Sequence, residues 1–165
     1  MELGLKNKNV LIVGASKGIG KGIVMGFAEE ACRLVIVARS EDLLREVQTE
    51  ALSRGAASCD YVVQDIMECD TQKFADSLMD RFGVFDVVIH NVGGSLISRN
   101  HLGGADDWNY ALKFNAIAAI DMNSRLIPPM VERGYGRVIH ISSISAVMLR
   151  GNPLYASAKA FLNAY

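Results

Sequence analysis

A tyrosine and a lysine stand four residues apart, at Tyr155 and Lys159, at the start of a predicted helix. Residues at positions i and i+4 share a helix face, with Cβ atoms about 5–6 Å apart. An ammonium about 4 Å from a phenol oxygen favours the phenolate by about 4 kcal/mol at an effective dielectric constant near 20. Such a pair can exchange a proton near neutral pH. The same spacing also occurs in ordinary surface pairs, so its meaning depends on the residues that precede it.

A glycine-rich turn lies between a predicted strand at 9–13 and a predicted helix at 21–31. This order of elements is typical of a phosphate-binding site, because the helix N-terminus presents free N–H groups to an anion. Glycine permits the tight turn, the close approach of a pyrophosphate and close packing of the helix on the sheet. A turn with only a packing role is the alternative. The spacing is Gly-x-x-x-Gly-x-Gly, and the candidate residues are Gly14, Ser16, Lys17, Gly18, Ile19 and Gly20.

The two motifs together resemble those of the classical short-chain dehydrogenase/reductase family. That family has the loop Thr-Gly-x-x-x-Gly-x-Gly and the catalytic pair Tyr-x-x-x-Lys, and here Val13 stands where threonine is usual. Asp65 and Ile66 are similar to the family's pair that holds the adenine. A further segment resembles the element Asn-Asn-Ala-Gly, with its first and third residues as departures, and consists of His90, Asn91, Val92 and Gly93.

The resemblance also implies the reaction and the catalytic residues. It implies hydride transfer between the nicotinamide and a carbonyl or secondary-alcohol carbon, with Tyr155 as acid or base and Lys159 holding the nicotinamide ribose. Asn115 falls at the family's helix asparagine, which holds a water in a proton relay. A serine would polarise the substrate oxygen. Ser143 matches the family motif with one residue fewer than usual before Tyr155 and is the preferred prediction, whereas Ser142 has the usual separation and is the alternative.

The second predicted strand ends in a cation rather than a carboxylate. In dinucleotide-binding folds an acid about 20 residues past the glycines takes the ribose 2′-OH of NAD, whereas an arginine accommodates the 2′-phosphate of NADP. Arg39 occupies the strand end, and Lys17 in the glycine loop could contact the same phosphate. Glu41 and Asp42 are interpreted as first-turn helix acids behind a Ser40 cap. We therefore predict NADP(H) as the preferred cofactor, with NAD(H) as the alternative.

Apolar segments alternate with helical patterns along the whole chain, which is typical of parallel βαβ units with right-handed crossovers. The predicted fold class is α/β, a Rossmann-like doubly wound parallel sheet in three layers, α/β/α, within one domain over 1–165. Family members usually continue beyond the helix that carries Tyr155, so we expect a fragment of a longer enzyme, with a sheet that is incomplete at the C-terminal end; the alternative is a form that no longer catalyses. Strands are predicted at 9–13, 34–38, 61–64, 87–89 and 138–141, and helices at 21–31, 41–53, 71–82, 106–132 and from 153.

Composition agrees with a globular enzyme and excludes other classes. Hydrophobic residues make up 50% of the chain and the formal net charge is -1, so the basic footprint of a nucleic-acid-binding protein is missing. No apolar run has the length of a membrane span, and the first residues lack a signal-peptide pattern. The three cysteines have no metal-ligand spacing and are interpreted as reduced structural thiols. These features predict a cytoplasmic protein with no metal, nucleic-acid or membrane partner.

The helices suggest self-association. The segments at 106–132 and from 153 resemble the pair through which family members associate, and the run at 116–120 is apolar for a surface. We expect a homodimer or homotetramer that acts on a small carbonyl or alcohol substrate, with simple packing of the run on the sheet as the alternative. Two other functions fit the sequence: a non-catalytic NADP(H)-binding regulator or scaffold, and, with less support, a sugar-nucleotide epimerase or dehydratase, whose loop is usually Gly-x-x-Gly-x-x-Gly.

Overall fold

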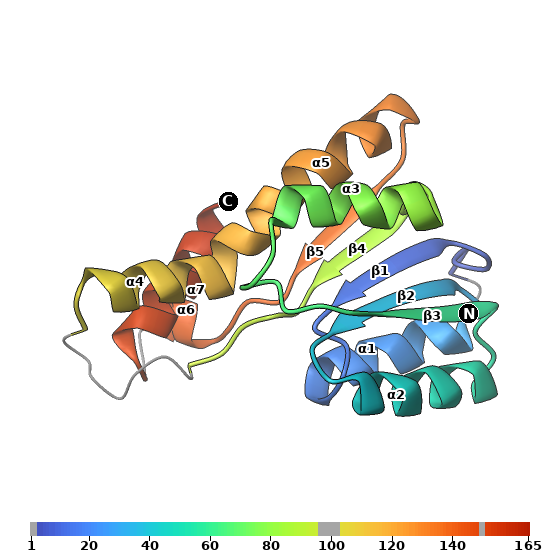
Figure 1. Cartoon of the computed structure of the whole chain (residues 1–165), viewed down its shortest axis with the longest axis horizontal. Coiled ribbons are helices and arrows are strands. Elements are labelled where there is room, and N and C mark those ends of the chain that lie inside the picture. Colours follow the sequence, from blue (N-terminus) through green and yellow to red (C-terminus); the bar gives the residue numbers. More distant parts are fainter. Residues whose placement is uncertain (1–2, 96–102, 149–150) are drawn as a thin grey trace.

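Five parallel strands form one sheet in the order β3-β2-β1-β4-β5 (Figure 1). The computed structural model describes residues 3–95, 103–148 and 151–165. From β1 the chain first adds strands on one side and then on the other, which confirms the predicted doubly wound sheet. The strands are β1 (Asn9–Val13), β2 (Arg33–Ala38), β3 (Ser58–Val63), β4 (Val87–His90) and β5 (Arg137–His140).

Helices cover both faces of the sheet and complete the three layers. The pair α1 and α2 covers one face, and the pair α3 and α5 covers the other (Figure 1). The helices α4, α6 and α7 lie beyond the carboxyl ends of the strands. The helices are α1 (Gly18–Glu29), α2 (Glu41–Ser53), α3 (Thr71–Phe82), α4 (Ala105–Leu112), α5 (Ala118–Glu132), α6 (Ser145–Met148) and α7 (Pro153–Ala164).

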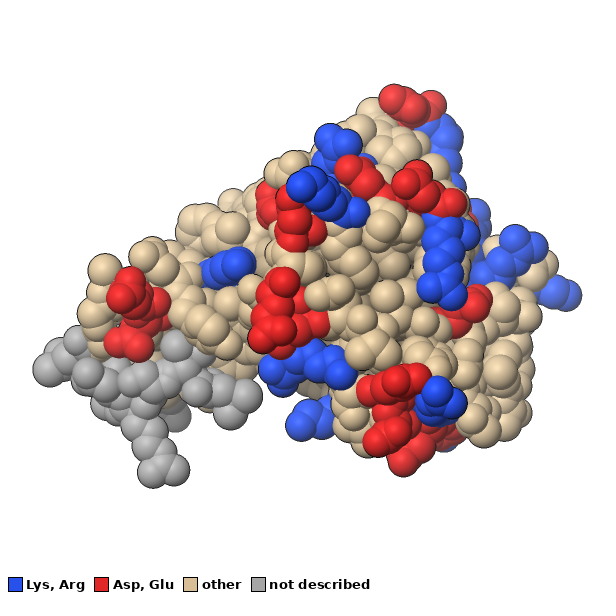
Figure 2. Space-filling view, viewed as in Figure 1, with Lys and Arg blue, Asp and Glu red and all other residues tan. Residues whose placement is uncertain are grey.

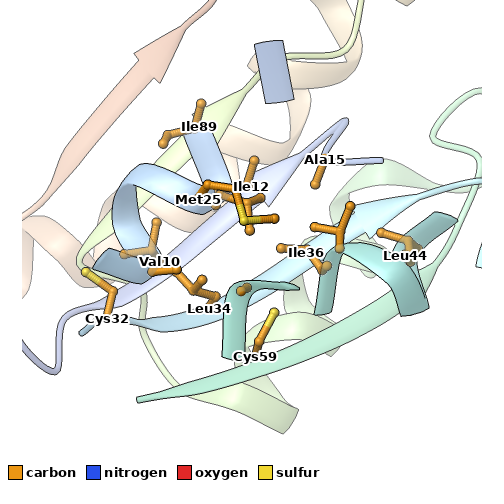
Figure 3. Close-up of a cluster of buried hydrophobic side chains, with 14 of the residues drawn as sticks. Val10, Ile12, Ala15, Met25, Cys32, Leu34, Ile36, Leu44, Cys59 and Ile89 are labelled. Carbon is orange, nitrogen blue, oxygen red and sulfur yellow. The ribbon is translucent and has the colours of Figure 1, made fainter. Parts of the chain in front are cut away.

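Two apolar cores, one on each face of the sheet, hold the layers together. Val10 and Ile12 of β1 point into the core beneath α1 and α2 (Figure 3). Leu11 and Val13 alternate with them and pack against α3 and α5. All four are at most 1% exposed. Because both faces are buried, this strand is a continuous apolar run rather than an alternating one.

The cysteines behave as packing residues. Cys32 and Cys59 belong to the core beneath α1 and α2 (Figure 3), and burial raises the pKa of their thiols to about 11 and about 12. Cys69 is half-buried, and all three thiols are free. A thiol with a raised pKa is protonated and unreactive at neutral pH, in agreement with the expected structural role.

The long helix expected at 106–132 is divided in the structure. The helix α4 ends at Leu112, a π-helical turn follows at Lys113–Ile117, and α5 begins at Ala118. A π turn holds an extra residue, and such turns occur at functional sites. Apolar periodicity does not reveal it, because the segment remains helical on both sides.

Other boundaries also differ from the predictions. The strand β3 begins at Ser58 rather than 61, and α1 begins at Gly18 rather than 21. Polar residues start β3 and glycines start α1, so the apolar pattern begins later than the hydrogen-bonded element. The short helix α6 was not predicted at all, because four residues are too few to show a helical period.

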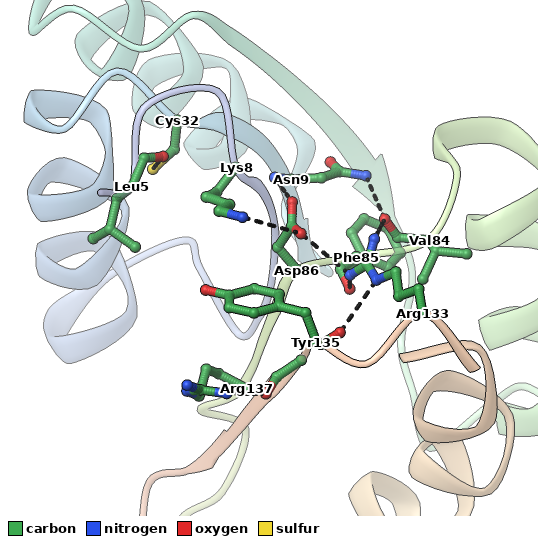
Figure 4. Close-up of polar contacts among 11 residues, drawn as sticks. Leu5, Lys8, Asn9, Cys32, Val84, Phe85, Asp86, Arg133, Tyr135 and Arg137 are labelled. Atoms are coloured by element: carbon green, nitrogen blue, oxygen red, sulfur yellow. Dashed lines mark hydrogen bonds and ion pairs between the residues drawn. The ribbon is translucent and has the colours of Figure 1, made fainter. Parts of the chain in front are cut away.

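Asp86 is the centre of a group of polar contacts at the amino-terminal end of the sheet (Figure 4). Its carboxylate accepts a hydrogen bond from the Asn9 N–H at 2.8 Å and forms ion pairs with Lys8 at 3.8 Å and Arg133 at 3.3 Å. Lys8 also lies 4.1 Å from the centroid of the Tyr135 ring. These contacts join β1 to the turn between α5 and β5, at the end of the sheet opposite the carboxyl ends of the strands.

Acidic and basic side chains are intermixed on the face of the molecule shown in Figure 2. Some pair between helices: Arg125 of α5 lies 2.9 Å from Asp76 of α3, and Lys21 of α1 lies 2.8 Å from Glu50 of α2. Exposed pairs of this kind contribute only about 0–1 kcal/mol each, so the apolar cores dominate stability. None of the described helices has the length and apolarity needed to cross a membrane.

Candidate cofactor and catalytic site

A cleft of about 470 Å³ opens at the carboxyl ends of the strands. It lies where the strand order reverses, between β1 and β4, which is the place where open α/β sheets bind ligands. Its volume is within the range of small-molecule sites, about 300–1,000 Å³. The predicted cofactor residues that line it are Gly14, Ser16, Lys17, Gly18, Ile19, Arg39, Asp65, Ile66, Asn91, Val92, Gly93, Tyr155 and Lys159.

The glycine loop packs tightly against the segment that follows β4. Gly14 has a φ of 91°, and a Cβ at this position would lie 2.9 Å from the Val92 backbone nitrogen. A Cβ at Gly20 would collide with the Gly14 carbonyl oxygen. The Asn91 side-chain amide donates to that same oxygen at 2.8 Å. The loop therefore needs glycine at both positions, and Asn91 holds it in place.

The first turn of α1 faces the cleft and suits an anion. Lys17, the N-cap residue, makes no side-chain capping hydrogen bond, and the first turn contains no acidic residue. The first N–H groups of a helix lack partners within the helix, and the helix dipole adds positive charge there. Since Ser16, Gly18 and Ile19 also line the cleft, these residues fit the pyrophosphate of a dinucleotide.

Arg39 follows β2 and lies beside Asp65, which follows the neighbouring β3. Arg39 Nη1 is 3.4 Å from Asp65 Oδ2, and the two side chains are 68% and 23% exposed. The carboxylate also accepts the Met67 N–H at 2.9 Å. Arg39 uses one of its five N–H groups in this pair, so the others can bind a ligand. Ser40 precedes α2 as predicted, but its side chain makes no capping hydrogen bond.

Asn115 lies in the π turn and is only 2% exposed. Its side-chain oxygen accepts the Gly94 N–H at 2.8 Å, and its amide donates to the Ala111 carbonyl at 3.0 Å. A Cβ at Gly93 would lie 2.7 Å from Asn115 Oδ1 and 2.8 Å from Lys159 Nζ. The extra residue of the π turn thus places Asn115 beside Lys159, with room only for a glycine between them.

Lys159 is 2% exposed and holds a fixed position in the cleft wall. Its ammonium donates to the Ile141 carbonyl at 2.8 Å, and burial lowers its pKa to about 8. Within the described residues, no hydrogen bond joins the ammonium to the Tyr155 hydroxyl. Both residues belong to α7, where the Asn152 side chain accepts the Leu154 N–H at 2.9 Å. The predicted helix start after 152 is therefore confirmed.

The two candidate serines differ in their surroundings. Ser142 lines the cleft, but its hydroxyl oxygen is buried and has no hydrogen-bond partner among the described residues. Ser143 is half-buried, and its oxygen accepts the Ser145 N–H at 3.1 Å, at the start of α6. The Ser143 O–H group can still donate to a ligand.

Sequence reasoning missed several residues that shape the cleft. Phe114, which directly precedes Asn115, lines the cleft. Leu43 of α2 lines it as well, and the Ile141 backbone holds Lys159. A backbone carbonyl and single apolar side chains do not belong to any sequence motif, so no pattern identifies them. Only their positions next to motif residues could have indicated them.

Curated proteins of similar sequence are oxidoreductases. The chain is 29% identical to a 3-oxoacyl-(acyl-carrier-protein) reductase of Chlamydia muridarum, an alignment that covers 94% of this chain and 64% of that protein. It is 30% identical to an uncharacterized oxidoreductase of Mycobacterium tuberculosis, with 98% and 62% covered. The chain thus spans less than two thirds of the length of these relatives.

The solved structures that resemble this chain include two reductases. The L-sorbose reductase of Gluconobacter frateurii, complexed with NADPH and L-sorbose, superposes with a TM-score of 0.89 at 30% identity, covering 98% of this chain and 62% of that one. An NADH-dependent reductase complexed with NAD superposes with a TM-score of 0.89 at 24% identity over 99% of this chain and 72% of that one, which shows the fold alone. Residues 8–165 match the family described as short chain dehydrogenase. The chain therefore belongs to the short-chain dehydrogenase family.

Proposed function

We propose that this protein is an NADP(H)-dependent oxidoreductase that transfers hydride between the nicotinamide and a carbonyl or secondary-alcohol carbon. The observation that carries the proposal is that one cleft is lined both by the glycine loop and by Tyr155 and Lys159, with Asn115 and Lys159 both packed against Gly93. The sorbose reductase binds NADPH and a sugar, which supports this cofactor and this substrate class.

Each candidate residue would have a separate role in the reaction. Bound NADP(H) supplies or accepts the hydride. Tyr155 donates its hydroxyl proton to the carbonyl oxygen in reduction and takes it back in oxidation. The Lys159 ammonium stabilises the charge on the tyrosine oxygen and holds the nicotinamide ribose, while its bond to Ile141 fixes its position. Asn115 would hold a water that passes protons behind Lys159.

The experiment that tests the function is a screen for carbonyl reduction. The purified protein is incubated with NADPH and ketosteroids, keto thioesters, sugars or simple aldehydes, and oxidation of NADPH is followed by its absorbance. We expect oxidation with at least one class. Saturable NADPH binding without turnover on any class would instead favour a non-catalytic regulator, and absence of NADPH binding would refute both.

The substrate oxygen is assigned to Ser143, because this half-buried residue keeps a free O–H, whereas the Ser142 hydroxyl oxygen is buried, although Ser142 and not Ser143 is among the residues that line the cleft. We expect Ser143→Ala to lower turnover by about 10²–10³-fold, the usual cost of a lost oxyanion donor. Ser142→Ala should change turnover by less than about threefold. Steady-state kinetics of the two variants decides between the serines, and the opposite ranking would transfer the role to Ser142.

The preference for NADP(H) is assigned to Arg39 and Lys17, which both line the cleft. We expect Arg39→Asp to weaken NADPH binding by about 10²-fold, because it removes a charge-assisted hydrogen bond and adds a repulsive charge. NADH binding should change by less than about threefold. Fluorescence titration of both cofactors measures this. Arg81→Asp, an equal charge change at an exposed position of α3, is the control. An equal loss of affinity for both cofactors in Arg39→Asp would contradict the assignment.

We also propose that the protein is cytoplasmic and forms a homodimer or homotetramer through the helical segment α4 to α5 and α7. Ala116 and Ala118 of the apolar run are buried, whereas Ile117 is 40% exposed. Part of the run therefore packs inside the protein, and part is available to a second copy. Light scattering at micromolar concentration should show an oligomer that Ile117→Lys converts to a monomer, because a charge cannot be buried without a partner. A wild-type monomer would contradict the proposal.

A further inference from the structure

Two histidines meet at the carboxyl ends of β4 and β5. His90 and His140 are direct cross-strand neighbours, and their rings stack with centroids 5.0 Å apart. Asn123 of α5 lies between them: its side-chain oxygen is 2.8 Å from His90 Nε2, and its nitrogen is 3.1 Å from His140 Nε2. His90 is 5% exposed and Asn123 is 1% exposed. No step of the proposed mechanism uses this cluster.

The hydrogen bonds define where the protons are. A carboxamide oxygen only accepts, so His90 must donate through its Nε2–H. A carboxamide nitrogen only donates, so His140 must accept at an unprotonated Nε2 and carry its proton on Nδ1. A proton added to His140 Nε2 would point at the Asn123 NH2 group and break this bond. The bond between Asn123 and His140 therefore exists only while His140 is neutral, whereas His90 can donate to Asn123 in either charge state. The Nδ1 of His140 is buried and has no hydrogen-bond partner among the described residues.

The cluster is connected to Lys159 through a single residue. The Ile141 N–H donates to the His90 carbonyl at 2.9 Å, and the Ile141 carbonyl accepts the Lys159 ammonium at 2.8 Å. The preceding residue, His140, is tied to α5 by Asn123. The position of the acceptor that holds the ammonium thus depends on how the end of β5 is anchored.

We infer, on the basis of the proposed function, that His90, Asn123 and His140 form a positioning device that holds Lys159 through Ile141 and works only while the His140 imidazole is neutral. These residues touch neither cofactor nor substrate and are positioning residues rather than catalytic ones.

The charges around the cluster favour the neutral form. The titratable groups that face His140 in the described chain are His90, the Lys159 ammonium and Tyr165, whose ring lies 5.7 Å from the His140 ring. No carboxylate of the described residues contacts the cluster. Burial lowers the pKa of His90 to about 4, and burial together with Lys159 lowers the pKa of His140. The device therefore stays intact at neutral pH and is lost in acid.

The first test reads the protons directly and needs no activity. In ¹⁵N-labelled protein without cofactor at about pH 6.5, near the usual imidazole pKa, we expect neutral His90 in the Nε2–H form and neutral His140 in the Nδ1–H form. Single substitutions to glutamine assign the signals. A cationic His140 ring, or His140 in the Nε2–H form, overturns the inference whether or not the protein reduces a carbonyl.

The second test asks whether the hydrogen bond between Asn123 and His140 affects the pKa and the catalytic role of Lys159. His140→Gln keeps an acceptor for Asn123 but cannot titrate, whereas His140→Leu has no acceptor. We expect the glutamine variant to keep turnover within about threefold of the wild type and the leucine variant to lose about tenfold in kcat, with little change in the substrate KM. The Lys159 ¹³Cε titration should move by about half a pH unit only in the leucine variant. Identical behaviour of the two folded variants in this titration refutes the positioning role.

A third variant places a charge within the cluster. Asn123→Asp puts a carboxylate between the two rings, which favours a charged imidazole. We expect a histidine that titrates between about pH 5 and 8 and turnover that falls as this ring takes up its proton. Asn7→Asp, the same change at an exposed residue before β1, is the control and should leave both readouts as in the wild type. An Asn123→Asp pH profile equal to that of the control counts against the inference.

Discussion

Replacement of Tyr155 by phenylalanine is expected to lower turnover by about 10²–10⁴-fold, which is the usual contribution of general acid–base catalysis. The substitution removes only the hydroxyl, the group that would exchange the proton with the substrate oxygen. The ring stays in the cleft wall at the start of α7. NADPH affinity should therefore stay within about threefold of the wild type. Initial rates and fluorescence titration measure the two effects.

Tyr135→Phe is the matched control for this change. It removes the same hydroxyl from a ring that lies beside Lys8 at the amino-terminal end of the sheet (Figure 4) and does not line the cleft. Its turnover should equal that of the wild type. If Tyr155→Phe kept more than about a tenth of wild-type turnover, the loss would fall below the expected range, and the proton would have to come from another group.

Lys159→Met is expected to lower turnover as strongly as Tyr155→Phe and also to weaken NADPH binding by about tenfold, the effect of losing one hydrogen bond from a charged group. Methionine fills a similar volume but cannot donate to Ile141 or carry charge. Titration of the variant with NADPH separates the two substitutions. Lys73→Met, at an exposed position of α3, is the control. A Lys159→Met variant with full NADPH affinity would show that the ammonium does not contact the cofactor.

The same lysine predicts a dependence of cofactor binding on pH. Burial lowers the pKa of Lys159 to about 8, so the ammonium loses its proton as the pH rises through this value. NADPH affinity should therefore fall between about pH 7 and 9 in the wild type and stay constant in Lys159→Met. The effect on folding has the opposite sign: because the folded pKa lies below the unfolded one, this residue adds stability as the pH rises from about 8 toward 10.4.

The sequence predicted the elements whose signal is local. The helices α2 and α3 begin and end at the predicted residues, 41–53 and 71–82, because amphipathic periodicity and flanking polar residues define both ends. In α3 the Asp70 side chain accepts the Lys73 N–H, as an N-cap residue should. The π turn around Asn115 and the short α6 were missed, because neither changes the apolar pattern.

The candidate residues could be named from the sequence because each belongs to a motif with a set spacing, and spacing decides which groups share a strand end or a helix face. Their contacts could not be named. Arg39 meets Asp65, 26 residues away, and Lys159 meets the Ile141 carbonyl, 18 residues away.

The sequence by itself therefore determined the α/β class and the set of candidate residues, since periodicity, glycine spacing and helix repeat are local properties of the chain. Only the tertiary structure decided which of these residues touch, which serine hydroxyl is buried, and that His90 meets His140 through Asn123. The physical reason is that such contacts arise when strands and helices that are distant in the chain pack together. The local pattern of apolar and polar residues identifies each element but does not say which side chains of different elements meet.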